Sequence, residues 1–201
     1  MKKNLKNKYI CILISIIMIF TSSCGQVIVG GAATAGLSVV QERSSTQAAV
    51  DIIIKTQIEE AMFSNDYEKL FSKIRVIVYE GRVLIVGTVE TEKNKEQVEE
   101  IAWNTKNVQE VANYITIGKN NLVDYVKDTR ISLEFRAKLL TDKEVSEVNY
   151  SSTTENRVLY IVGIAQNKEE IEKVILHGSN IAGVTKIVNL IIEKNDPKRK
   201  K

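Results

Sequence analysis

The chain has 201 residues, of which 44% are hydrophobic and 26% charged, so it is long enough to bury a core and too apolar for a disordered protein. Four lysines precede the first apolar run and four basic residues end the chain; without these eight the formal charge falls from +3 to −5. A basic surface suited to nucleic acid is therefore not expected on the folded part, and no nucleic-acid partner is predicted.

Residues 1–23 are typical of a secretory signal peptide. Lysines at the start form a positive segment, and residues 9–20 form an apolar run too short to span a bilayer comfortably. A retained N-terminal membrane anchor is the alternative. Small residues then lead to Cys24, in a pattern that resembles the bacterial lipobox. That resemblance implies that Cys24 is the first residue of the mature lipoprotein and the site of lipid attachment, including palmitate.

The cysteine content leaves few other uses for Cys24. Cys11 lies within the apolar run and leaves with the signal, so the mature chain holds one cysteine and no intramolecular disulfide can form. A metal site built on thiolates needs several cysteines, and a lone thiol in an oxidising compartment is a liability unless it is modified. No metal and no cofactor are predicted. Residues 24–45, rich in Gly, Ala and Val, are predicted to be the acylated cysteine and a flexible tether.

An internal repeat occupies most of the remaining chain. Residues 80–117 align without a gap with residues 156–193, and Gly87 then meets Gly163. This agreement in residue and spacing indicates a tandem duplication of one small module. We therefore predict a first domain over residues 46–117, a second domain over residues 118–193 and a basic disordered tail over residues 194–201.

The first copy predicts the order helix, strand, strand, helix, strand. Apolar residues at helical spacing within residues 50–62 predict a helix, which Thr46 or Asp51 could cap. Two β-branched runs then flank Glu80 and Gly81, which is a hairpin signal. An amphipathic helix and a final strand follow at residues 91–106 and 110–117.

The second copy repeats this order. Its helices are expected at residues 124–140 and 168–177, and its strands at 148–150, 158–164 and 185–192. Arg157 replaces Gly81 at the hairpin turn, where Asn156 can tolerate a positive φ. The strand–helix–strand connection favours a right-handed crossover and a parallel pair. The predicted fold class is therefore α+β, with two tandem αββαβ domains, each a three-stranded mixed sheet with two helices on one face.

These features resemble the BON domain. The resemblance rests on the αββαβ order, the strand GRVLIVG with Gly81 and Gly87, and the closing segment VQEVANYI. The second copy keeps Gly163 of this motif. Two such domains behind a lipobox are similar to the dual BON-domain outer-membrane lipoproteins. The resemblance implies a periplasmic, lipid-anchored, non-enzymatic protein at the outer membrane that binds anionic phospholipid and supports envelope integrity.

The resemblance also places the lipid surface on the first helix of the second domain. Ile131, Phe135 and Leu139 recur there at helical spacing and are expected to face the core, which leaves basic and apolar groups outside. The predicted phospholipid-binding residues are Lys127, Arg130, Leu133 and Leu140. The alternative is an ordinary amphipathic helix with a solvated charged face.

Catalysis is not expected. The one histidine, His177, is predicted to be structural or solvent-facing, and no serine lies in a nucleophile elbow. Trp103, the only tryptophan, could cover its own core, lie between the two domains or contact a partner. The second functional hypothesis is an adaptor that recruits or regulates an envelope protein, with lipid contact incidental. The oligomeric state stays open.

Overall fold

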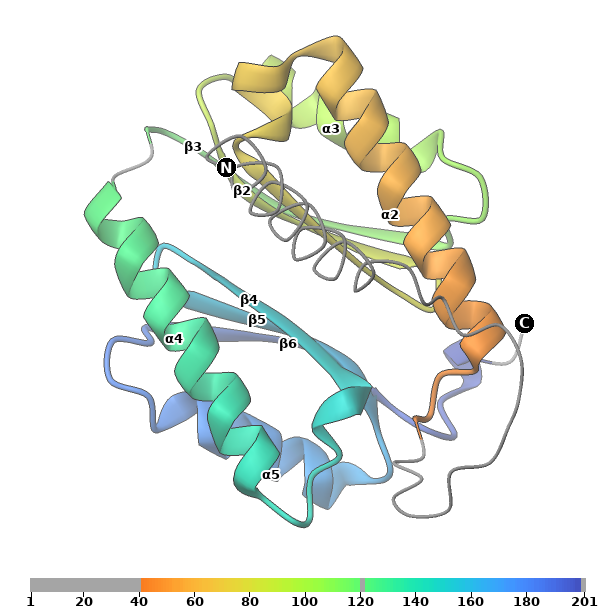
Figure 1. The fold of residues 1–201 in the computed structure, drawn as a ribbon, viewed down its shortest axis with the longest axis vertical. Helices are drawn as coiled ribbons and strands as arrows, with labels where there is room; N and C mark the ends of the chain where they lie inside the picture. Colours follow the sequence, from red (N-terminus) through yellow and green to blue (C-terminus); the bar gives the residue numbers. More distant parts are fainter. Residues whose placement is uncertain (1–40, 120–121, 200–201) are drawn as a thin grey trace, which may run out of the picture. The chain divides into compact units, whose positions relative to one another are not determined.

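The computed structural model describes residues 41–119 and 122–199, and the chain from Val39 onward forms one compact unit (Figure 1). The predicted signal peptide, Cys24 and most of the predicted tether lie outside the described residues. Within these residues two αββαβ repeats follow each other, which confirms the predicted fold class. None of the described helices is long and apolar enough to cross a membrane.

The first domain begins with helix α2 (Ser45–Asn65). Ser44 caps this helix, because its side chain accepts a hydrogen bond from the backbone N–H of Gln47 at 3.1 Å. The expectation of a cap at Thr46 or Asp51 was therefore wrong. The domain continues with a π-helical turn η2 (Tyr67–Phe71), strands β1 (Ile74–Tyr79) and β2 (Arg82–Val89), helix α3 (Glu92–Trp103) and strand β3 (Glu110–Ile117).

The first sheet has β2 in its centre, with β1 antiparallel on one side and β3 parallel on the other. The antiparallel pair is closed by Glu80 and Gly81, both with positive φ, in the type of turn that suits the twist of a two-residue hairpin. The parallel pairing of β2 and β3, which are joined through α3, confirms that part of the expected connection. Helices α2 and α3 cover one face, and their buried apolar side chains are Ile54, Ile58, Met62, Val98 and Ala102.

The second domain has the same topology, with β5 in the centre of its sheet, antiparallel to β4 and parallel to β6. Ile131, Phe135 and Leu139 of its first helix are buried in the core of this domain, as expected. The elements are α4 (Leu122–Thr141), the 3₁₀ turn η3 (Glu147–Asn149), β4 (Tyr150–Glu155), β5 (Val158–Ala165), α5 (Lys168–Ser179) and β6 (Lys186–Glu193).

Strand β4 lies later in the chain than predicted. Its residues pair with β5 from Tyr150 to Glu155, so the strand begins where the predicted one ended. The sequence YSSTTE lacks the apolar alternation on which the prediction relied. It forms a strand because Thr154 and Glu155 are buried and make hydrogen bonds to neighbouring side chains.

The described end of the chain also differs from the expected disordered tail. Pro197–Arg199 forms a 3₁₀ turn, η4. The guanidinium of Arg199 donates to both carboxylate oxygens of Glu80, at 3.0 and 2.9 Å, and to the backbone carbonyl of Glu42 at 3.0 Å. Through these hydrogen bonds, the segment after the second domain contacts the hairpin of the first domain.

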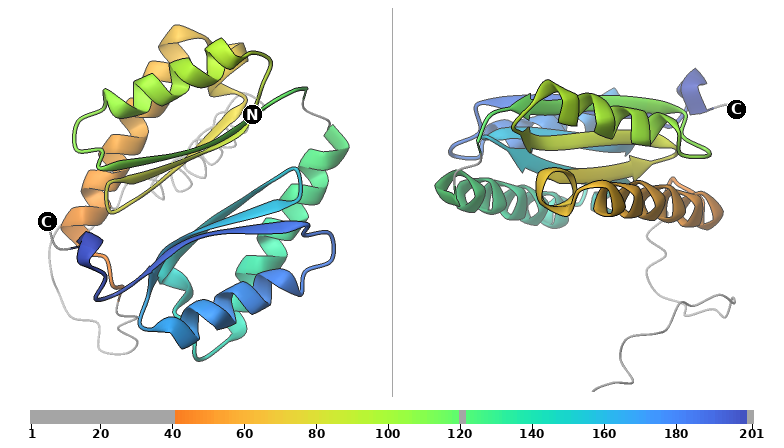
Figure 2. Two further views of the ribbon diagram at one scale, coloured as in Figure 1. Left: turned by 180° about the vertical axis from the view of Figure 1, so that it is seen from behind. Right: turned by 90° about the horizontal axis from the view of Figure 1, so that it is seen from above.

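The two domains pack through the sheet faces that the helices leave open (Figures 1 and 2). Equivalent positions of the two repeats supply the contact, such as Val86 and its counterpart Val162. Burial in this interface raises the pKa of Tyr79 to about 12. The buried members are Tyr79, Leu84, Val86, Tyr160, Val162, Ile164 and Val188.

A partly buried polar contact crosses this interface. Arg75 of β1 pairs with the carboxylate of Glu155 of β4, and it also donates to the backbone carbonyl of Thr154 at 2.7 Å. Thr88 of β2 donates to the other oxygen of Glu155 at 2.8 Å. The Glu155 carboxylate is thus satisfied by two side chains from the first domain, which fixes how the domains align.

Candidate functional site

Helix α4 is held in one rotation about its axis by its buried side. In addition to the apolar residues described above, Asp128 is only 4% exposed. Its carboxylate accepts the backbone N–H groups of Asn156 and Arg157, both at 2.8 Å. Since these N–H groups belong to the hairpin turn, the helix cannot rotate without breaking both bonds. Its outward side is therefore defined.

All four residues predicted to bind phospholipid are exposed on α4. Leu133 and Leu140 keep 66% and 63% of their surface, and Lys127 and Arg130 are also exposed. Seven residues are close to two helical turns, so Leu133, Leu140 and the 63% exposed Val126 lie on one line along the helix. The structure thus brings the two leucines together and adds Val126, which the sequence analysis did not single out.

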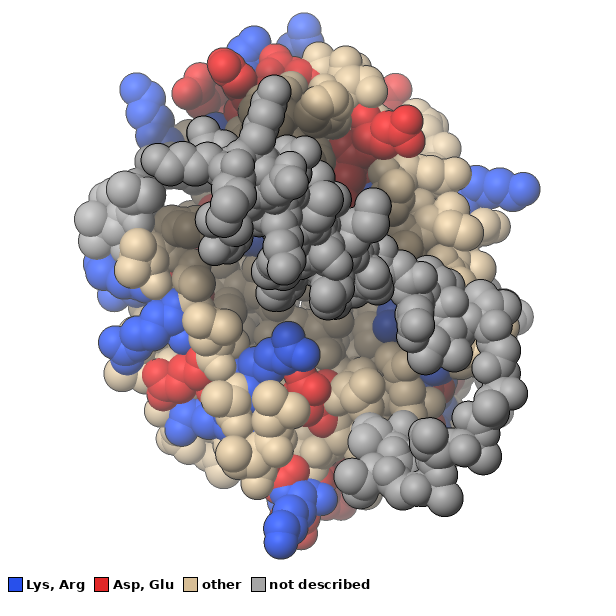
Figure 3. Space-filling model, in the orientation of Figure 1, with Lys and Arg blue, Asp and Glu red and all other residues tan. Residues whose placement is uncertain are grey.

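Basic side chains accompany this apolar line. By helical phase, Arg130 and Arg136 lie on opposite flanks of the line, each about 60° from it, and Lys127 lies farther round on the side of Arg130. Arg130 is 3.7 Å from Glu134, and Arg136 donates to a carboxylate at 2.7 Å. These pairs are exposed, so they are weak and leave the cations open to other anions. Figure 3 shows Lys and Arg side chains along the side of the molecule that α4 occupies.

An exposed aromatic side chain near the start of α4 was missed by the sequence analysis. Tyr125 keeps 58% of its surface. Tyrosine is common at membrane–water interfaces because its ring is apolar and its hydroxyl is polar. The signal that could have found it is an aromatic residue at a position outside the buried phase of the helix.

The first domain presents a different exposed group, the aromatic cluster formed by Phe63, Tyr67 and Phe71. The ring of Phe63 meets the other two edge-on, with centroids 5.5 and 5.4 Å away, and Tyr67 stacks on Phe71 at 5.7 Å. Phe63 and Tyr67 are 55% and 53% exposed. This cluster is a second apolar surface, at the end of α2.

The histidine pairs with a carboxylate, and the tryptophan lies away from the contact between the domains. His177 lies 2.7 Å from Asp142, and this hydrogen bond lowers the pKa of the Asp142 carboxyl. Trp103 is 52% exposed and lies outside the interdomain cluster. Among the described residues, no group of three or more His, Cys, Asp and Glu side chains could hold a metal ion.

Comparison with known proteins defines the class. The profile of the BON domain matches residues 51–119 and again residues 127–195. The chain therefore belongs to the BON-domain family and carries two copies of the domain.

Three proteins are similar in sequence to most of this chain. The chain is 32% identical over 152 residues to an uncharacterized protein in the gshII 5′ region of Anaplasma centrale, with 75% of this chain and 99% of that protein covered. It is 24% identical over 174 residues to the outer membrane lipoprotein DolP of Haemophilus influenzae, covering 86% and 89% of the two chains. It is also 24% identical over 153 residues to a 21 kDa hemolysin of Actinobacillus pleuropneumoniae, covering 76% and 78%.

Proposed function

We propose that this protein is a lipid-anchored envelope protein that binds anionic phospholipid through the outward side of α4 and has no catalytic turnover. Its place is the periplasmic face of the outer membrane, attached through acylated Cys24. In this role it supports envelope integrity. The name of the similar Haemophilus protein, an outer membrane lipoprotein, supports the location.

One observation carries the lipid proposal. A line of exposed apolar residues on α4, formed by Val126, Leu133 and Leu140, has cationic side chains on both of its flanks. A helix that lies in the membrane interface buries apolar side chains among the acyl chains and places basic groups near anionic head groups. Each basic group close to such a surface contributes about 1 kcal/mol.

Co-sedimentation with vesicles tests this proposal. The assay uses residues 25–201 of the chain. This fragment should fold by itself, because all three buried clusters lie within the compact unit from Val39 onward. Binding to phosphatidylglycerol vesicles should exceed binding to phosphatidylcholine vesicles. Arg130→Glu should weaken it about tenfold, because attraction becomes repulsion at a membrane-facing position.

The matched control for Arg130→Glu is Lys93→Glu. Lys93 is an exposed residue of α3, and its replacement makes the same change in charge away from α4. This control should bind as the unmodified chain does. Equal binding to both vesicle types, or unchanged binding of Arg130→Glu, would contradict the lipid proposal.

The anchor has its own test. Cys24→Ala in the full chain should abolish incorporation of labelled palmitate and move the protein out of the outer-membrane fraction. If labelled palmitate still enters the variant, Cys24 is not the site of attachment.

A second candidate function is favoured by the aromatic cluster of Phe63, Tyr67 and Phe71. Exposed aromatic side chains are enriched where protein partners dock. In this reading the protein is an adaptor for an envelope partner. Phe63→Ser should then abolish the capture of that partner from envelope extracts, while vesicle binding through α4 stays unchanged.

A further inference from the structure

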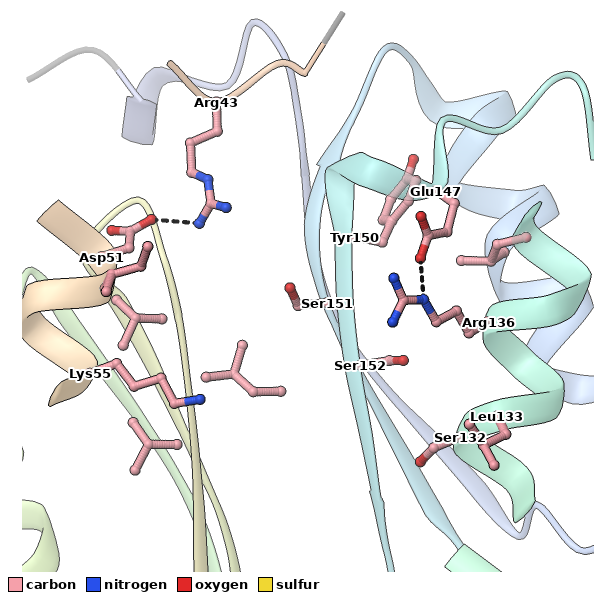
Figure 4. A pocket seen from close by; sticks show the side chains of 15 residues that line it. Arg43, Asp51, Lys55, Ser132, Leu133, Arg136, Glu147, Tyr150, Ser151 and Ser152 are labelled. Carbon is pink, nitrogen blue, oxygen red and sulfur yellow. Dashed lines mark hydrogen bonds and ion pairs between the residues drawn. The ribbon is translucent and has the colours of Figure 1, made fainter. Parts of the chain in front are cut away.

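A groove lies between the two domains, beside the outward side of α4, with which it shares Leu133. It has a volume of about 530 Å³ and is bounded by α2 and β1 of the first domain and by α4 and β4 of the second (Figure 4). Strands β1 and β4 are each an edge strand of their sheet, so the groove lies where each sheet has an unpaired edge. Its volume is within the range of small-molecule sites.

Part of the lining is apolar. Val76 and Val78 of β1 and Leu139 of α4 line the groove and are buried. Ile52 of α2 and Leu133 of α4 line it from the two helices, and each keeps 66% of its surface exposed. The groove therefore offers hydrocarbon contacts from both domains.

Cationic side chains approach the groove from both sides. Lys55 of α2 extends its ammonium group into the gap, and Arg136 of α4 extends its guanidinium from the opposite side (Figure 4). Nε of Arg136 donates to Glu147 at 2.7 Å, and its two Nη atoms have no hydrogen-bond partner among the described residues. Lys55 is 3.6 Å from Glu59 in an exposed pair, which is weak.

Hydroxyl groups and net charge complete the chemistry of the groove. Ser151 and Ser152 of β4 line the gap between the two cations (Figure 4). Arg43 and Asp51 also line it, but they neutralise each other in a 2.9 Å ion pair. Cations among the lining residues exceed carboxylates by one, which favours an anionic ligand.

We infer that the groove binds a single anionic phospholipid molecule. Its phosphate lies between Lys55 and Arg136, and an acyl chain lies against Ile52, Val76 and Leu133. The inference rests on the proposed function for the class of ligand, and it adds a second subsite that both domains build. Because Leu133 contributes to the outward line of α4 and to the groove, a lipid contacted at the membrane surface has a continuous apolar path into the groove.

An extended peptide added to the edge of β1 is the competing occupant. It is disfavoured because Arg75 reaches from β1 to Thr154 and Glu155 of β4 and closes one end of that edge. Two opposed cations also add nothing to the main-chain hydrogen bonds of an added strand, whereas they form strong charge-assisted hydrogen bonds with a phosphate.

The test separates single-lipid binding from membrane binding. Residues 25–201 are titrated with dihexanoyl phosphatidylglycerol below its micelle concentration, followed by calorimetry. Lys55→Glu and Arg136→Gln should each weaken binding about tenfold, because each removes a charged hydrogen-bond donor. Ser152→Trp, which fills the groove without changing charge, should weaken it equally. The control Lys93→Glu, outside both the groove and the outward side of α4, should bind this monomeric lipid normally.

Two results would overturn the inference. One is unchanged affinity in both Lys55→Glu and a folded Ser152→Trp, with folding checked by thermal denaturation. The other is equally tight binding of glycerophosphoglycerol, which has the head group but no acyl chains and would reveal an anion site only. Failure of the outward-surface proposal appears differently, as loss of the preference for anionic vesicles while binding of the monomeric lipid persists.

Discussion

The two domains share one topology, but their outer strands β1 and β4 have opposite character. β1 reads IRVIVY and supplies Arg75, whereas β4 reads YSSTTE and supplies Glu155. The counterpart of Arg75 in the second repeat is Ser151, and the counterpart of Glu155 in the first is Tyr79. In an exact repeat, Arg75 would meet a tyrosine at the position of Glu155. Divergence of the two strands therefore creates the complementary pair.

The two hairpin turns differ in sequence and agree in geometry. Gly81 has a φ of 72°, and Arg157 at the same place has a φ of 62°. In both domains a buried aspartate, Asp51 or Asp128, accepts the two backbone N–H groups of the turn. The carboxylate holds the turn, so glycine is dispensable in the second domain even though a side chain costs about 1 kcal/mol in this conformation.

In both domains a glycine lets two backbone segments approach closely. Adding a side chain at this glycine should have the largest effect on stability. A Cβ added at Gly87 would clash with the carbonyl oxygen of Lys73, and one at Gly163 with that of Asn149. We expect Gly87→Ala and Gly163→Ala each to lower the free energy of unfolding by about 3 kcal/mol. Urea denaturation measures this loss. Because the interdomain cluster joins the sheets, each variant should shift one common transition; a loss confined to a separate early transition would contradict this coupling.

Removing the asymmetric charge pair should have the next largest effect. Glu155→Gln keeps the shape of the side chain but leaves Arg75 without its carboxylate. The side chain of Arg75 is 37% exposed, so solvent screens part of the loss, and we expect a destabilisation of about 1–2 kcal/mol by the same assay. Glu134→Gln is the matched control, since its pair with Arg130 is exposed, and it should change stability by about 0.5 kcal/mol or less.

Replacing the turn residues tests how the two hairpins tolerate a side chain at positive φ. Arg157→Gly should stabilise the protein by up to about 1 kcal/mol, because the strain of a positive φ is partly offset by the entropy that glycine loses. Gly81→Ala should destabilise it by about 1 kcal/mol, since its Cβ would lie 3.0 Å from the carbonyl oxygen of Asn107. Thermal denaturation of both variants measures the two signs. A destabilising Arg157→Gly would mean that the Arg157 side chain itself contributes.

The smallest expected effect is a difference in acid sensitivity. The pKa of Asp142 is lowered chiefly by its hydrogen bond with His177, and that of Asp66 in the first domain by the backbone N–H of Lys69. A lowered folded-state pKa gives stability that is present above the unfolded-state value and is lost as pH falls through the folded-state value. Both contributions should therefore begin to decline near pH about 4 and be lost progressively as the pH falls further.

His177→Gln separates these two contributions. It should reduce only the part that belongs to Asp142, whereas Asp66→Asn should remove only the other. Melting temperatures recorded from pH 6 down to acid conditions measure both. An unchanged acid profile in both variants would show that neither carboxyl contributes.

Local sequence predicted the elements well because each module is organised by short-range patterns. The repeat alignment, the hairpin at Glu80 and Gly81, and the helical spacing of Ile131, Phe135 and Leu139 are all visible in one dimension. The cap at Ser44 and the outward position of Val126 and Tyr125 depend on where each helix begins and how it rotates. The buried Asp128 settles that rotation, and its partners are far away in the sequence.

The sequences of the two central strands also indicate the contact between the domains. Strand β2 and its counterpart β5 are apolar on both faces, as expected for strands covered on both sides. The polar strand β4 carried no such signal, because its burial depends on Arg75 and Thr88 of the other domain. Likewise, the basic end of the chain gave no indication that Arg199 would meet Glu80.

The face-to-face packing of equivalent sheet positions has a consequence for the duplication itself. Two separate copies of one module would have to meet by diffusion to hide these faces. Joining the copies through residues 118–121 makes their association intramolecular, with an effective concentration on the order of millimolar for a short connection. The duplicated module thus behaves as a covalently linked dimer. Its apolar sheet faces stay covered even when the protein is dilute.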